Sequence, residues 1–156
     1  LNRPETIKSV CEIAIGFGLE VEYLSMGDGN EDEISQKACS AIGVKVIHAS
    51  EFALKDLPEI LRNYDFAISG RHHLNLFLTQ AHIPFVPLPS NTWKIDGTLQ
   101  QLKYPMKPAC NMLDLHEELM RLLNQNKKYA SKSKKSATIG LKLTKKFIKE
   151  LQYAVN

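Results

Sequence analysis

The chain has 156 residues, of which 44% are hydrophobic, as expected for one folded globular domain. It contains no run of about 18 apolar residues, which argues against a transmembrane helix. Its three cysteines, Cys11, Cys39 and Cys110, are far apart and show no CxxC or Cys/His spacing, which argues against a disulfide framework or a metal site. We therefore expect a cytoplasmic protein with all three cysteines in the core, no metal and no cofactor.

The net charge of +3 is unevenly distributed along the chain. Nine lysines and no acidic residue lie between positions 127 and 149, whereas the rest of the chain has eleven basic and seventeen acidic residues. This basic tail is either a solubilising helix or a contact for anionic lipid or an acidic neighbouring domain. Contact with lipid would make the protein peripheral to a membrane. Aromatic residues do not interleave with the lysines, so we predict no nucleic-acid partner.

In chain order, apolar periodicity and Gly/Pro punctuation predict a helix at 4–17, a strand at 20–25, a helix at 31–42 and a strand at 44–47. A short helix at 54–63, a strand at 66–69, a helix at 71–81 and a strand at 84–88 follow. The remainder is predicted as helices at 95–103 and 113–126, a Lys/Ser-rich joint, and an amphipathic helix at 139–153. We divide the chain into a Rossmann-like domain at 1–112 and a helical segment with the lysine-rich tail at 113–156.

Strands that alternate with helices predict an α/β fold: a Rossmann-like parallel sheet with helices on both faces. Ligands of such sheets bind beyond the carboxyl ends of the strands, where this chain has loops at 26–30, 49–52, 70–73 and 89–94. The first predicted element is a helix, although such domains normally begin with a central strand. That strand either lies upstream of Leu1 or is supplied by a partner.

The segment from Gly70 to His73 is the strongest candidate for a ligand site. It places Arg71, His72 and His73 at the start of a helix, where cations are unfavourable by about 0.3–1 kcal/mol each, and no acidic residue follows before Asp96. An anion held by the backbone N–H groups and by Arg71 would explain this composition. The alternative is a helix start whose histidines merely pack or face water. No GxGxxG or P-loop motif is present.

A second group of polar residues follows the next strand. Ser90, Asn91 and Lys94 offer a hydroxyl, an amide and an ammonium group beside the segment of Arg71 and His73. Because adjacent parallel strands end at the same edge, these residues predict a basic rim. Ser90 or Asn91 could instead cap the following helix.

The stretch from Asp65 to Leu99, DFAISGRHHLNLFLTQAHIPFVPLPSNTWKIDGTL, resembles the C-terminal half of polysaccharide pyruvyl transferases. The resemblance lies in an ordered set of features: a strand ending in Ser-Gly, Arg-x-His opening a helix, a His-Ile-Pro turn, a strand, and a polar loop with a lysine. It is close over 65–104 and covers 4–64 only as a helix–strand pattern. His72 at the x position and Trp93 before the lysine depart from the family.

This resemblance implies one half of a GT-B-like fold, with a cleft between two Rossmann-like domains. The implied reaction transfers pyruvate from phosphoenolpyruvate to a sugar of a cell-surface polysaccharide, in exopolysaccharide and cell-envelope biosynthesis. Arg71 and His73 would bind the donor phosphate or carboxylate and take part in catalysis, and Gly70, Ser90, Asn91 and Lys94 would complete the donor site. The implied partners are phosphoenolpyruvate, a saccharide acceptor, and an absent N-terminal domain or another copy of the chain.

Two other functions fit the same residues. The chain could be the donor domain of a GT-B glycosyltransferase that binds a nucleotide sugar, with Glu51 as the only plausible acid for the ribose hydroxyls. It could also be a non-catalytic Rossmann-like binding module.

Overall fold

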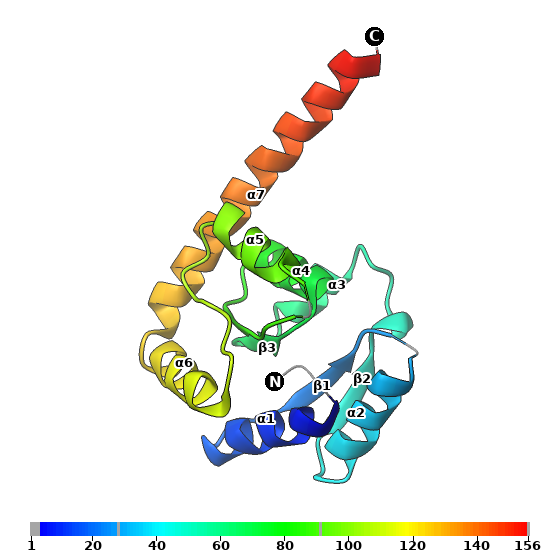
Figure 1. Cartoon of the computed structure of the whole chain (residues 1–156), viewed down its shortest axis with the longest axis vertical. Helices are drawn as coiled ribbons and strands as arrows, with labels where there is room; N and C mark the ends of the chain where they lie inside the picture. Colours follow the sequence, from blue (N-terminus) through cyan, green and yellow to red (C-terminus); the bar gives the residue numbers. More distant parts are fainter. Residues whose placement is uncertain (1–3, 28, 91, 156) are drawn as a thin grey trace.

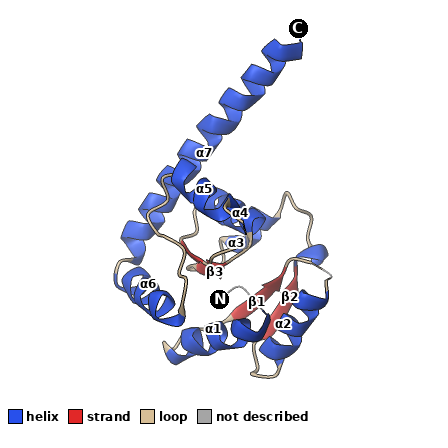
Figure 2. Cartoon of the chain, viewed as in Figure 1, coloured by secondary structure: helices blue, strands red, loops and turns tan. Residues whose placement is uncertain are grey.

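The computed structural model of the protein describes residues 4–27, 29–90 and 92–155, with side chains between residues 6 and 145. The chain alternates helices and short strands through its first two thirds and ends in two helices (Figures 1 and 2). It is therefore a mixed α/β protein, as the alternating pattern predicts.

The four strands form two separate parallel pairs. Strand β1 (Glu22–Ser25) pairs with β2 (Lys45–His48), and β3 (Ala67–Ser69) pairs with β4 (Phe85–Pro87). No ladder joins β1 to β3 among the described residues. The prediction of parallel pairing is thus confirmed, whereas a full Rossmann-like sheet is not confirmed, because the described strands form two separate two-stranded sheets.

Helices connect the strands within and between the two pairs. Helices α1 (Pro4–Gly16) and α2 (Asn30–Ser40) pack together beside β1 and β2, and α3 (Leu57–Leu61) packs on α4 (His72–Ala81) beside β3 and β4. A short 3-10 helix, η1 (Ala49–Glu51), follows β2. In Figure 1, α1 and α2 lie below the strands and α3 and α4 lie above them.

The outer edge of β4 is closed by residues that follow helix α5 (Lys94–Gln101). The Tyr104 hydroxyl accepts a hydrogen bond from the Phe85 N–H (2.6 Å) and donates one to the Phe85 carbonyl (2.8 Å). The Ala109 N–H donates to the Pro87 carbonyl. The rings of Phe85 and Tyr104 also stack, with centroids 4.2 Å apart. Strand β4 is therefore hydrogen-bonded on both sides although it pairs with only one strand.

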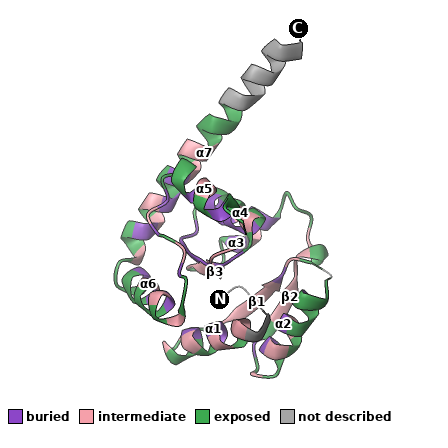
Figure 3. Cartoon of the chain, viewed as in Figure 1, coloured by how far each residue is buried: buried purple, intermediate pink, exposed green. Residues whose placement is uncertain are grey.

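The last third of the chain consists of α6 (Met112–Asn124) and the long α7 (Asn126–Val155). Asn111 caps α6 by accepting a hydrogen bond from the Asp114 N–H, and Leu115, Leu119 and Leu122 of α6 join the core that contains Phe85. Helix α7 packs on α4 and α6 with its first half and then extends away from the body (Figures 1 and 3). None of the described helices combines the length and the apolar character needed to cross a membrane.

Two expectations for this half of the chain are wrong. The Lys/Ser-rich joint is not a break between helices, because α7 is continuous through it: Tyr129, Ser133 and Ser136 lie on one buried face, and the Ser133 hydroxyl donates to the Ile83 carbonyl. Cys11 and Cys39 are buried as expected, but Cys110 is exposed because it lies in the loop before α6.

Candidate functional site

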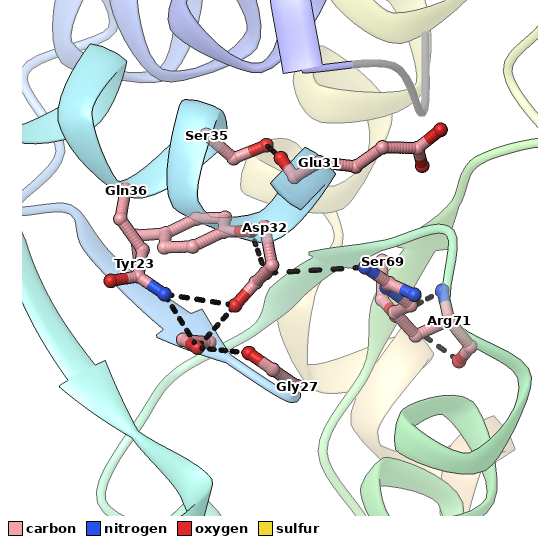
Figure 4. A network of polar contacts seen from close by, with 9 residues as sticks. Tyr23, Gly27, Glu31, Asp32, Ser35, Gln36, Ser69 and Arg71 are labelled. Carbon is pink, nitrogen blue, oxygen red and sulfur yellow. Dashed lines mark hydrogen bonds and ion pairs between the residues drawn. The ribbon is translucent and has the colours of Figure 1, made fainter. Parts of the chain in front are cut away.

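The first feature of the candidate site is a buried carboxylate at the end of β1. Asp32, in the first turn of α2, is only 3% exposed. It accepts hydrogen bonds from the hydroxyls of Tyr23 (2.8 Å) and Ser25 and from the side-chain amide of Gln36 (3.0 Å), as Figure 4 shows. Tyr23 and Ser25 belong to β1, so the strand and the helix that follows it are tied together at this carboxylate.

The charge of Asp32 is stabilised in this environment. Burial by itself raises the pKa of a carboxyl group, but the hydrogen bonds from Ser25, Tyr23 and Gln36 and the positive charge of Arg71 outweigh it and hold the pKa of Asp32 below its usual range. Burial and the bond to Asp32 raise the pKa of Tyr23, so its hydroxyl stays a hydrogen-bond donor. Asp32 is thus an ionised carboxylate whose charge is stabilised by hydrogen bonds from protein groups.

Arg71 meets Asp32 from the other strand pair. It is the residue before α4, directly after β3, and its N–H donates to the Ser69 hydroxyl. One guanidinium nitrogen lies 3.9 Å from an Asp32 oxygen, and the Arg71 side chain is 55% exposed (Figure 4). This separation exceeds the length of an N–H···O hydrogen bond. Asp32 therefore orients the guanidinium electrostatically without a direct hydrogen bond at that atom pair.

This contact corrects one expectation. The sequence suggests that no acid offsets the cationic helix start locally, yet Asp32, about forty positions away, lies beside Arg71 in the fold. The segments that follow the carboxyl ends of β1 and β3 therefore lie close to each other. The loop at 26–30 was expected at this edge, but Tyr23, Ser25, Asp32 and Gln36 were not recognised as site residues. Acidic residues are common in the first turn of a helix because they interact favourably with the helix dipole, so Asp32 did not stand out in the sequence.

A cavity of about 560 Å³ adjoins Arg71. Gly70 and Arg71 line it, together with polar side chains from β1 and α2 and many apolar side chains from α1, α3 and α4. His73, Ser90 and Lys94, which were expected to share a pocket with Arg71, do not line this cavity. Asn91 lies outside the described residues.

The other predicted basic residues lie at the starts of α4 and α5. The His72 and His73 rings contact each other edge to face, and the His72 Nδ1 atom lies 3.3 Å from the Thr98 hydroxyl of α5. Burial and the nearby positive charges of His73 and Lys94 lower the pKa of His72. Ser90 forms a local turn by accepting from the Thr92 N–H. The fold thus brings the side chains of His72, His73 and Lys94 near one another, and His73 and Lys94 do not line the cavity.

The site contains no evident metal centre, since no group of three or more His, Cys, Asp or Glu side chains in the described part of the chain could hold a metal ion. Comparison of the chain with protein-family models, with curated proteins and with solved structures finds no match.

Proposed function

We propose that the chain is the donor-binding half of a polysaccharide pyruvyl transferase and that Arg71 binds the phosphoenolpyruvate donor. The observation that carries this proposal is the half-exposed guanidinium at the junction of β3 and α4, aligned by Asp32 at 3.9 Å. Arginine can bind a carboxylate or a phosphate through two parallel N–H groups. A buried carboxylate behind it would hold the side chain in place while its outer face meets the ligand.

The surrounding charges suit a donor that carries two anionic groups. Phosphoenolpyruvate has a carboxylate and a phosphate at neighbouring carbons. Arg71 would bind one of them, and the basic residues at the starts of α4 and α5, His73 and Lys94, would attract the other. The N-terminus of α4, a helix of ten residues, adds backbone N–H groups and a partial positive charge.

The proposed chemistry assigns separate roles to these residues. One hydroxyl of an acceptor sugar attacks C2 of phosphoenolpyruvate while an acid protonates C3. A second hydroxyl then displaces phosphate to close the pyruvate ketal. Arg71 would neutralise the anionic groups of the donor, and His73 would bind the phosphate or act as the acid. Fixed cations of this kind stabilise developing negative charge by several kcal/mol. We expect no turnover from this chain alone, because a GT-B-like active site lies between two domains.

The experiment is a binding titration of phosphoenolpyruvate against the parent chain, Arg71→Ala and Arg121→Ala. Arg121 is a matched control because its side chain is 56% exposed and pairs with acids on its own helix, α6. We expect the parent and Arg121→Ala to bind equally, and Arg71→Ala to bind about ten- to a hundredfold more weakly, since a charged hydrogen bond contributes about 1.5–3 kcal/mol.

Thermal melting of the three unliganded proteins separates a binding defect from a folding defect. Arg71→Ala should melt within a few degrees of the parent, because the guanidinium is half-exposed and lies 3.9 Å from Asp32, which keeps its hydrogen bonds from Tyr23, Ser25 and Gln36. Equal binding by Arg71→Ala and the parent would refute the assignment. A response to a nucleoside diphosphate but not to phosphoenolpyruvate would support the glycosyltransferase alternative, and a response to neither would support a non-catalytic module.

A further inference from the structure

The cavity lies between the edges of two strands. Its lining includes the unbroken runs 19–24, around β1, and 63–71, around β3. Successive residues of a strand point to opposite faces, so a cavity that touched one face would be lined by every second residue. Strand β2 contributes only Ile47, and no residue of β4 itself lines the cavity. The cavity is therefore bordered by the inner edges of β1 and β3, the edges turned away from β2 and β4.

At these inner edges, no neighbouring strand is hydrogen-bonded to the backbone N–H and C=O groups within the described residues. In a parallel pair, each strand directs the N–H and C=O groups of alternate residues toward its opposite edge. Within the described residues, β1 pairs only with β2, and β3 pairs only with β4. The outer edge of β4 shows the contrast, because Tyr104 and Ala109 close it. Backbone groups that face an apolar space are costly unless they find partners, so these edges favour a further strand.

Apolar side chains enclose the space from both sides. Helix α1 presents Ile7, Val10, Cys11 and Ala14 to the cavity, at the spacing of one helix face, and α3 and α4 present Ile60, Leu61, Leu74 and Leu78. Figure 1 places α1 and the α3–α4 pair on opposite sides of the strands. An element inserted there would be buried on both faces. A central strand of a parallel sheet has this environment and is built from Val, Ile and Leu.

We infer that the cavity is the seat of a fifth parallel strand, an apolar β-branched segment that leads into α1. The strand order would become β2, β1, inserted strand, β3, β4, with all strands parallel. Such a strand would reach β1 through α1 as β1 reaches β2 through α2, and crossovers of this kind are nearly always right-handed. The order would reverse at the inserted strand, which is where doubly wound sheets bind their ligands. This inference does not depend on which ligand Arg71 binds.

The test appends a strand of about five residues, Val-Thr-Val-Ile-Val, to Leu1 through a short Gly/Asn loop. A matched control carries Pro at the second and fourth positions of the appended strand, since proline cannot donate to a central ladder. Amide hydrogen exchange is then compared between the two fusions. We expect the amides of β1 and β3 that face the cavity to exchange about tenfold more slowly in the Val/Ile fusion, with no change in α7.

The same peptide added in trans to the unfused chain covers the case in which the fusion is insoluble. We expect it to protect the same amides at millimolar concentration, and less strongly than the fusion does. Equal exchange in the Val/Ile and proline fusions, or protection of residues outside β1 and β3, would overturn the inference. If the free peptide protects these amides and the fusion protects them no better, the inference that the inserted strand leads into α1 is refuted. Phosphoenolpyruvate titrations of the fusions separate this result from the donor proposal.

Discussion

The two strand pairs have the same parallel arrangement but differ in how they are covered. All residues of β4 are buried, and its Phe85 belongs to one large core together with Leu78 of α4 and Leu115 of α6. In the β1–β2 pair only Ser25 is fully buried, and the adjacent core is the small cluster of Cys11, Cys39 and Val44. The two strand pairs have similar hydrogen bonding but bury different amounts of apolar surface. Burial, more than strand pairing, therefore determines which half of the molecule is more stable.

The largest expected effect tests the stronger half. Phe85→Ala removes a fully buried ring that stacks on Tyr104 and should lower the free energy of unfolding by about 3–5 kcal/mol. Val44→Ala, in the small cluster, should cost about 1–2 kcal/mol, near 0.8 kcal/mol for each buried methyl group lost. Urea unfolding monitored by circular dichroism measures both. A cost for Val44→Ala equal to that of Phe85→Ala would show that the two halves are equally supported.

A smaller effect tests how the outer edge of β4 is closed. Tyr104→Phe keeps the stacked ring but removes the hydroxyl that bonds both the N–H and the C=O of Phe85. It should destabilise the protein by about 1–3 kcal/mol, because two buried backbone groups lose their partner. Tyr64→Phe serves as control: its hydroxyl bonds the Glu22 carboxylate in a partly exposed position, so its loss should cost less. Equal costs would mean that water replaces the Tyr104 hydroxyl at β4.

The smallest effect concerns pH and the junction between the two halves. Because the pKa of Asp32 is lowered in the folded state, its contribution is fully present above the ordinary carboxyl pKa of about 4 and is lost as pH falls through the lower folded value. Between pH 6 and 3 the free energy of unfolding of Asp32→Asn should therefore fall less than that of the parent. We expect a difference on the order of 1 kcal/mol, the net contribution of a hydrogen bond. Denaturant midpoints of both proteins across this range provide the measurement, and parallel curves would exclude Asp32 as a titrating anchor.

The order of helices and strands could be predicted from the sequence because Gly and Pro residues mark the ends of many of these elements. Gly18, with a φ of +76°, and Gly43, with a φ of +78°, adopt the left-handed backbone conformation that favours glycine after a helix, just beyond the predicted helices at 4–17 and 31–42. The predicted break between helices at the Lys/Ser-rich stretch was wrong because it was based on composition alone. Its lysines suggest a solvated joint, whereas Ser133 and Ser136 are small enough to lie against the body in a continuous helix.

The candidate site could be predicted only in part, since its two charged groups are distant in sequence. Arg71 was found from local chemistry, a cation where the helix dipole disfavours one. Asp32 required knowledge of which strands face each other, and hydrophobic patterns do not encode the spacing between β1 and β3. The cluster of His72, His73 and Lys94 likewise depends on how α4 and α5 meet.

The paired cysteines between α1 and α2 have a consequence for the reactivity of the chain. The Cys11 and Cys39 sulfurs lie 3.8 Å apart as thiols, and burial together with the neighbouring Cys39 raises the pKa of Cys11 to about 12. Since only the thiolate attacks oxidants and alkylating reagents, Cys11 is largely unreactive at neutral pH while it stays buried. Exposed Cys110 is then the thiol that we expect to react first with such reagents. A Cys110→Ser background gives a chain whose remaining thiols report only on opening of the α1–α2 contact.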